Sequence, residues 1–207
     1  MKKALCIALA LILVFCLAAC GGSDSGGSSG GGGSAANTAE AKEYLDQAMA
    51  ACESGDIDEA LEAFGKTIEL DPGYADAYYW RGLVYKDFED YELAIKDLHK
   101  AVELSPDDMF NHHHLGEAYY YNEDYGLAIE SFGKSISLDP ENDFDYYCRA
   151  SVYFDIDCYE EALADLDKAI EINGDEVDYY YARAQIYELM GENDLADIDY
   201  AMAYILE

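Results

Sequence analysis

Large and small hydrophobic residues alternate in a pattern that repeats every 34 residues between positions 41 and 207. In each repeat a ring is followed four positions later by alanine or glycine; the rings belong to Tyr44, Tyr78, His112, Tyr146 and Tyr180. Sixteen positions after the ring comes an alanine, then a bulky residue and a small one; these alanines are Ala60, Ala94, Ala128, Ala162 and Ala196. Residues three and four apart share one face of a helix. The pattern therefore predicts two helices per repeat that pack large side chains against small ones.

The ends of the repeats carry residues that stop helices. Three of the first four repeats close on proline, and the fourth closes on Asn173-Gly174; both signals end a helix. The predicted order is helix, turn, helix, stop, in an all-α domain over residues 37–207. Its five units span 41–74, 75–108, 109–142, 143–176 and 177–207. Asn37, followed by Glu40, predicts a cap that opens the first helix.

These positions resemble the tetratricopeptide repeat, whose signature has an aromatic residue, Leu-Gly, Tyr, Ala, Phe and Pro at a period of 34 residues. The second unit matches it at Tyr78, Arg81, Gly82, Tyr85, Ala94, Leu98, Ala101 and Pro106. The resemblance implies an α-solenoid of about five tandem units in a right-handed superhelical arc. The family's glycine in the inner turn is present at positions 55 and 191. Glu89, Glu123 and Asp157 replace it in the other units, which leaves the geometry of those turns open.

The amino terminus resembles a bacterial lipoprotein signal peptide. Lys2 and Lys3 precede an apolar run over 4–19, which is too short for a lasting transmembrane helix. The run ends in Leu-Ala-Ala before Cys20, as in the lipobox. The resemblance implies cleavage after residue 19 and a diacylglyceryl group with palmitate-type chains on Cys20; the alternative is an ordinary cleaved signal. Residues 20–36 are rich in glycine and serine and predict a flexible tether. We expect a lipid-anchored protein on the extracytoplasmic face of the cell membrane, or of the outer membrane in a two-membrane cell.

The charge of the chain restricts its partners. Without Lys2 and Lys3, ten Lys and Arg residues stand against 44 Asp and Glu residues, a formal charge of 10 − 44 = −34. Recognition of phosphate needs clustered basic residues. Nucleic acid is therefore excluded as a partner, and the membrane is expected to be contacted only through the lipid. Most of the acidic residues are interpreted as solvated helix faces, and the rest would attract a basic segment or loosely hold divalent cations.

The family resemblance implies that the first helix of each unit lines a concave groove. The predicted groove residues are Tyr79, Trp80, Leu83, Phe110, His113, Glu117, Tyr120, Phe144, Tyr147, Ser151, Phe154, Tyr181 and Gln185. Such a surface suits a peptide or protein ligand with apolar and basic character. The alternative is that about half of these rings only follow the packing consensus of the repeat. The Lys, Asn and Arg positions with which some family members grip a terminal carboxylate are not matched.

Catalytic, metal and cofactor sites are not predicted. Consecutive helical residues point about 100° apart, so His112, His113 and His114 are not expected to converge on one ion, and only His113 shares a face with Glu117. No nucleophile lies in a catalytic arrangement, and no glycine-rich phosphate loop occurs, so the protein is predicted not to be an enzyme. Three thiols outside the amino-terminal segment, at Cys52, Cys148 and Cys158, indicate a compartment with little disulfide chemistry.

Together these features predict a membrane-anchored scaffold or adaptor of the bacterial cell envelope, which binds a peptide or protein segment in an aromatic and acidic groove. Two alternatives remain open. A glycan could stack on the same rings, or the protein could associate with itself through its apolar C-terminal helix.

Overall fold

The structure is a computed structural model and describes residues 35–207. The described part contains ten helices and no strand. They are α2 (Ala35–Ser54), α3 (Ile57–Leu70), α4 (Ala75–Asp87), α5 (Tyr91–Leu104), α6 (Met109–Tyr121), α7 (Tyr125–Leu138), α8 (Asp143–Asp155), α9 (Tyr159–Ile172), α10 (Val177–Met190) and α11 (Asn193–Leu206). The predicted signal peptide, Cys20 and the tether up to residue 34 lie outside the described residues.

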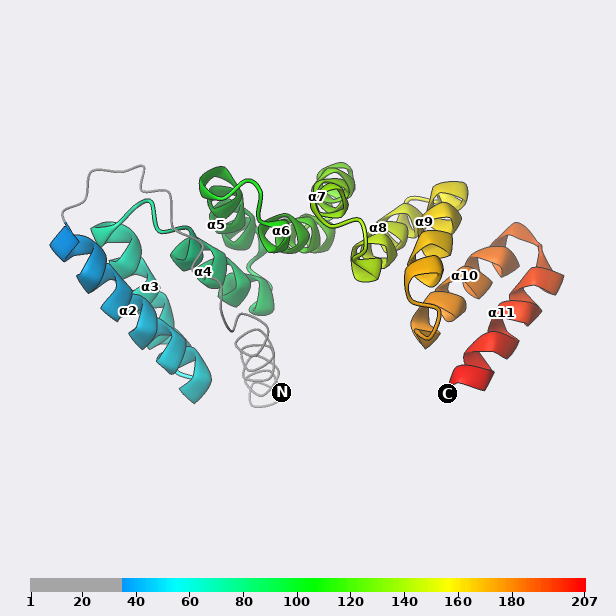
Figure 1. Cartoon of the computed structure of the whole chain (residues 1–207), viewed down its shortest axis with the longest axis horizontal. Helices are drawn as coiled ribbons and strands as arrows, with labels where there is room; N and C mark the ends of the chain where they lie inside the picture. The colour runs from blue at the N-terminus through cyan, green and yellow to red at the C-terminus, as the bar shows by residue number, and fades with distance from the viewer. Residues whose placement is uncertain (1–34) are drawn as a thin grey trace. The chain divides into compact units, whose positions relative to one another are not determined.

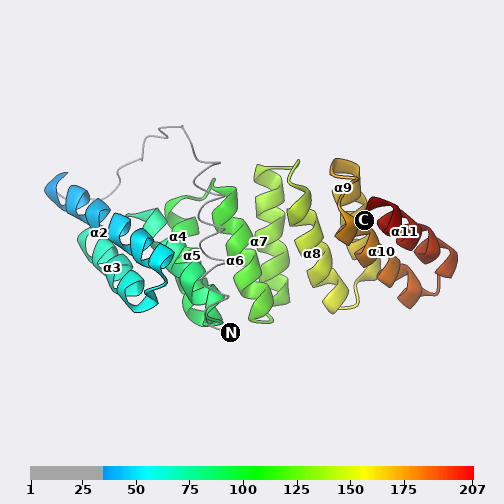
Figure 2. The ribbon, with the colours of Figure 1, turned by 90° about the horizontal axis from the view of Figure 1, so that it is seen from below.

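Consecutive helices pair into five antiparallel hairpins: α2 with α3, α4 with α5, α6 with α7, α8 with α9 and α10 with α11 (Figures 1 and 2). The all-α architecture of five helix-turn-helix units is thereby confirmed. Helices α4, α6, α8 and α10 begin at the first residues of units two to five. The expected cap at Asn37 is wrong, because α2 begins at Ala35 and places Asn37 inside the helix.

The chain divides into two compact units, with the boundary between Pro106 and Asp107. The N-terminal compact unit contains α2 to α5, and the C-terminal compact unit contains α6 to α11. Within each, the core forms where small residues of one helix meet large residues of its partner. A methyl group on Gly82 would lie 2.8 Å from the side chain of Leu98, and one on Gly116 would lie 2.9 Å from Phe132. Because real atoms do not approach so closely, these two glycines are required by the close contact of the paired helices.

The turn inside each hairpin has the same left-handed backbone in all five units. Gly55 and Gly191 have φ of 80° and 81°, and Glu89, Glu123 and Asp157 have φ of 63°, 64° and 58°. The turn geometry that the sequence left open is therefore kept. For residues other than glycine this conformation costs roughly 1–2 kcal/mol of steric strain, so three of the five turns store strain that a glycine would relieve.

Three hairpins are also joined by a charged pair across their two helices. Arg81 donates two hydrogen bonds to Asp97, at 2.6 and 2.9 Å. The same bidentate geometry joins the pairs Arg149–Asp165 and Arg183–Asp199. In α6 and α7 the corresponding positions hold Leu115 and Ser131, both buried. Both members of the charged pair are thus replaced by uncharged residues in this hairpin.

Cys52 is buried and Cys148 and Cys158 are half-buried, and no disulfide joins them. No helix among residues 35–207 has the length and apolar character needed to cross a membrane.

Candidate functional site

The C-terminal compact unit brings predicted groove residues from three helices together around two adjacent cavities. One cavity, of about 210 Å³, is lined by side chains of α6, α8, α9 and α10. The other, of about 170 Å³, is lined from α6, α7 and α8. Tyr120, Tyr147 and Ser151 line both, and we call the two cavities together the aromatic groove. Seven predicted residues line it: Glu117, Tyr120, Phe144, Tyr147, Ser151, Phe154 and Gln185.

The rings of the groove are held in place by one another and by carboxylates. Phe144 stacks on Tyr147 with 6.1 Å between ring centroids, and Tyr147 contacts Tyr179 at 5.1 Å. The hydroxyl of Tyr120 in α6 donates to Asp155 at the end of α8, at 2.7 Å. This contact ties two neighbouring first helices together beside the cavity. The sequence did not point to Tyr179, which is buried and anchored by a hydrogen bond to Asp143 at 2.7 Å.

The electrostatic character of the groove is acidic. Glu117 and Asp155 line it, and among the described residues no Lys or Arg lines either cavity. Burial is the largest cause that raises the pKa of the Tyr120 phenol, and the hydrogen bond to Asp155 raises it further. Burial is also the largest cause that raises the pKa of the Tyr147 phenol, and the negative charge of Asp178 adds to it. Both phenols are therefore neutral at physiological pH, and the groove offers uncharged aromatic faces beside carboxylates.

The remaining predicted residues of the C-terminal compact unit lie outside the two cavities. Phe110 is exposed. Tyr181 turns toward α11, where its ring contacts Tyr200 and its hydroxyl donates to Glu207 at 2.9 Å. His113 is buried, and its Nδ1 lies 2.5 Å from Oδ1 of Asp145.

The histidine run of α6 differs from expectation in one respect. The rings of His113 and His114 do not diverge: their centroids are 4.8 Å apart, with an interplanar angle of 78°. The two rings thus meet even though the Cβ atoms of consecutive helical residues point to different sides of the helix.

In the N-terminal compact unit, the predicted residues Tyr79, Trp80 and Leu83 pack mainly against other side chains of the protein. Leu83 is buried, and Trp80 packs partly buried against the core of α2, α3 and α4. The ring of Tyr79 meets that of Trp80 edge to face at 5.1 Å. These contacts match the alternative that some of the predicted rings serve packing.

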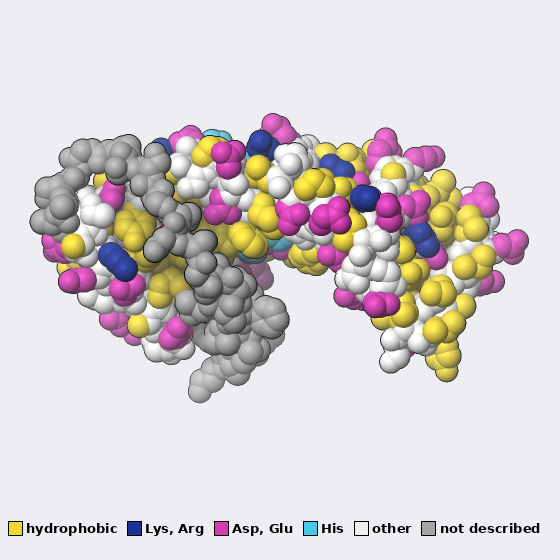
Figure 3. All heavy atoms as spheres, in the orientation of Figure 1, with side chains coloured by type: hydrophobic (Ala, Val, Ile, Leu, Met, Phe, Trp, Pro, Cys, Tyr) yellow, Lys and Arg dark blue, Asp and Glu magenta, His cyan; other side chains and the backbone are white. Residues whose placement is uncertain are grey.

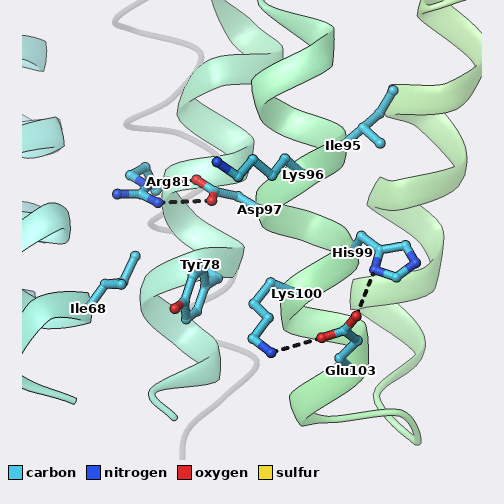
Figure 4. A pocket seen from close by; sticks show the side chains of 9 residues that line it. All are labelled: Ile68, Tyr78, Arg81, Ile95, Lys96, Asp97, His99, Lys100 and Glu103. Atoms are coloured by element: carbon cyan, nitrogen blue, oxygen red, sulfur yellow. Dashed lines mark hydrogen bonds and ion pairs between the residues drawn. The ribbon is translucent and has the colours of Figure 1, made fainter. Parts of the chain in front are cut away.

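A cavity of about 640 Å³ in the N-terminal compact unit lies on the side of α4 and α5 that carries the Arg81–Asp97 pair (Figure 4). It is lined by Ile68, Tyr78, Arg81, Ile95, Lys96, Asp97, His99, Lys100 and Glu103. Two of its basic groups are paired with carboxylates that also line the cavity. Arg81 binds Asp97, and Lys100 binds Glu103 at 2.8 Å (Figure 4). This cavity contains none of the predicted groove residues.

Three sequence profiles match the chain. Two are described as tetratricopeptide repeat and match residues 45–108 and 110–142, and one, described as TPR repeat, matches residues 150–191. No curated protein matches the chain in sequence.

Several solved structures share the fold. A crystal structure of MamA protein is 25% identical, covers 81% of this chain and 91% of its own, and has a TM-score of 0.78. MamA from Desulfovibrio magneticus RS-1 is 18% identical, covers 81% of this chain and 94% of its own, with a TM-score of 0.77. YrrB, described as a TPR protein with an unusual peptide-binding site, is 21% identical, covers 83% of this chain and 92% of its own, with a TM-score of 0.71.

Proposed function

Because the chain belongs to the tetratricopeptide repeat family, we propose that it is a protein-binding scaffold whose aromatic groove holds a peptide or protein segment. The observation that supports this most is the convergence of Tyr120, Tyr147, Ser151 and Phe154 from α6 and α8 on one open cavity. Residues that only follow a packing consensus would have their faces covered by neighbouring helices. Here the rings border space that a ligand side chain can enter.

The chemistry of the groove defines the ligand class. Neutral phenol rings offer apolar contact and attract cations through their faces. Glu117 and Asp155 add negative charge at the cavity edge, in a chain whose acidic residues greatly outnumber its basic ones. The preferred ligand is a segment that places Lys or Arg next to an apolar anchor. YrrB, a protein of the same fold, is described as having a peptide-binding site, which supports a peptide rather than a small molecule.

We further propose that the scaffold works at the bacterial cell envelope, attached by a lipid on Cys20, which lies outside the described residues. The support is the sequence pattern before Cys20 and the glycine- and serine-rich segment after it. Replacement Cys20→Ala is expected to move the protein from the membrane fraction to the soluble extracytoplasmic fraction. Retention of the variant in the membrane would contradict lipid anchoring.

A single substitution separates binding in the groove from folding of the protein. Ser151 lines both cavities, and its hydroxyl donates to the carbonyl of Tyr147 in its own helix. Ser151→Arg fills the cavity and adds positive charge without deleting a packing side chain. Ser137→Arg is the matched control, because Ser137 is exposed on α7 and its hydroxyl also bonds a carbonyl of its own helix, at 2.7 Å.

The experiment uses the protein and these two variants as baits in an envelope extract. The proposal expects a partner held by the parent and by Ser137→Arg and lost from Ser151→Arg, with unchanged helix content in all three. Equal capture by both variants contradicts binding in the groove. If the parent captures no protein but is retained on a carbohydrate matrix, the glycan alternative is favoured.

Self-association is a second candidate, supported by exposed hydrophobic residues on α11. Ile198, Tyr204 and Ile205 are 59%, 77% and 72% exposed, and hydrophobic side chains gather over this helix in Figure 3. Exposed apolar patches mark contact surfaces. If this face joins two copies, sedimentation should give a dimer that Ile198→Asp converts to a monomer. A parent that sediments as a monomer at all concentrations removes this candidate.

A further inference from the structure

We propose that His113, His114 and Glu117 form a binding site for one divalent transition-metal ion, zinc by the chemistry of its donors. One donor atom from each side chain lies within 4.8 Å of the others. Glu117 follows His114 by three residues and His113 by four, so it stands on the helix face between the two rings. The site shares Glu117 with the aromatic groove, but zinc binding to it does not require a bound peptide.

The orientation of His113 already suits a metal ligand. Its Nδ1 lies 2.5 Å from Asp145, a fully buried carboxylate. Carboxylate oxygens accept hydrogen bonds, so Nδ1 donates and Nε2 carries the lone pair. That Nε2 lies 3.7 Å from Oε2 of Glu117. A histidine that donates one nitrogen to a carboxylate and offers the other to the metal is the usual arrangement at zinc sites.

Asp145 is itself fixed from two other directions. Its Oδ2 accepts from the hydroxyl of Ser135 in α7 at 2.6 Å and from the amide of Asn142 at 3.0 Å. Its Oδ1 is thereby directed to His113. Asp145 is a positioning residue, because it orients the ring of His113 and does not reach the metal.

The other two donors can close around an ion with small movements. Nδ1 of His114 lies 2.7 Å from Oε2 of Glu117, and each of these side chains is 20% exposed. Zinc bonds of about 2.0–2.1 Å in a tetrahedral shell place donors roughly 3.4 Å apart. Rotation of the two partly exposed side chains reaches that spacing, and water can occupy the fourth position. Phe132 and Phe144 pack against the ring of His113 with centroid distances of 5.8 and 5.6 Å.

The donor set selects the ion. Two imidazole nitrogens and one carboxylate favour zinc over magnesium or calcium, which prefer oxygen ligands. The many surface carboxylates of this acidic chain will also attract cations weakly. A test must therefore separate one tight site from this background.

The test is calorimetric titration of the metal-free full chain with zinc chloride in excess magnesium, which occupies weak carboxylate sites. The proposal expects one tightly bound zinc per chain. His114→Ala should abolish this tight phase while the helix content of the variant, measured by circular dichroism, stays that of the parent. His99→Ala is the matched control: His99 pairs with Glu103 four residues later, at 3.4 Å, in the same way that His113 pairs with Glu117. It should leave zinc binding unchanged.

Asp145→Asn tests the positioning role. It should weaken zinc binding about 10- to 100-fold while the stoichiometry stays at one. A structural role alone would change thermal stability and leave the zinc affinity of the folded variant untouched. Cobalt provides a second readout, since nitrogen ligation gives visible absorption bands that His114→Ala should remove. No tight phase in the parent, or a tight phase that persists in His114→Ala, overturns the proposal.

Discussion

The pair of Arg149 and Asp165 provides a quantitative test of how the hairpins are held together. Arg149 donates two hydrogen bonds to Asp165, at 2.8 and 2.7 Å, and the two side chains are 21% and 9% exposed. The hydrogen bond to Asp165 raises the pKa of Arg149, so the guanidinium stays charged over the ordinary pH range. Removal of either partner leaves the other charge unpaired in a largely buried position.

The expected magnitudes differ between the two single variants. Arg149→Leu strands the more buried carboxylate and should cost about 3 kcal/mol of unfolding free energy. Asp165→Ser strands a guanidinium that can partly reach water, and the loss of charged hydrogen bonds should cost about 2 kcal/mol. The double variant reproduces the Leu115 and Ser131 pair of the third hairpin, and should cost about 2 kcal/mol or less because no charge is left unpaired.

Urea unfolding followed by far-ultraviolet circular dichroism measures these values, and the coupling energy of the cycle is expected to be about 3 kcal/mol. Lys168→Ala is the control, because Lys168 pairs with Glu171 at 2.9 Å on the exposed face of α9; it should leave the midpoint unchanged. A double variant that costs the sum of the two singles, about 5 kcal/mol, would refute the reasoning, because the two residues would then act independently.

Three further predictions concern turns, a thiol and a helix contact. Glu123→Gly should stabilise the protein by about 0.5–1 kcal/mol in urea unfolding, because glycine relieves the strain of the left-handed backbone. Gly191→Ala should destabilise the protein by about 1 kcal/mol, although the added methyl group meets no neighbour. The opposite signs would be inconsistent with backbone strain. Burial raises the pKa of the Cys52 thiol to about 11, so peptide-resolved alkylation of the native chain should label Cys52 far more slowly than the other two thiols, and equal rates would argue against its burial. Gly116→Ala should cost about 1–3 kcal/mol because its methyl group would overlap the ring packed against it at 2.9 Å, while Gly126→Ala, with no neighbour within 4 Å, should not destabilise.

The 34-residue period was sufficient to predict where the helices pair, because each large residue needs a small one opposite it. The close contacts at Gly82 and Gly116 follow from that rule. The turns could not be predicted in the same way, since Glu89 and its counterparts adopt a conformation that their residue types disfavour. There the packing of two helices determines the backbone of the turn that joins them.

The candidate site was only partly accessible from the sequence. Offsets along one helix predict which side chains share a face, and this placed Tyr120, Tyr147 and Ser151 around common cavities. They cannot predict contacts between helices, such as that of His113 with Asp145, 32 residues away. For the same reason the turn of Tyr181 toward α11 was not foreseen.

The affinity of a captured partner for the two serine variants tests the central claim most directly. If the aromatic groove binds the partner, Ser151→Arg should weaken binding at least about tenfold, a loss of about 1.4 kcal/mol, and Ser137→Arg should bind as tightly as the parent. Equal affinity of the two variants would contradict the account, since Ser151 lines both cavities and Ser137 lines neither.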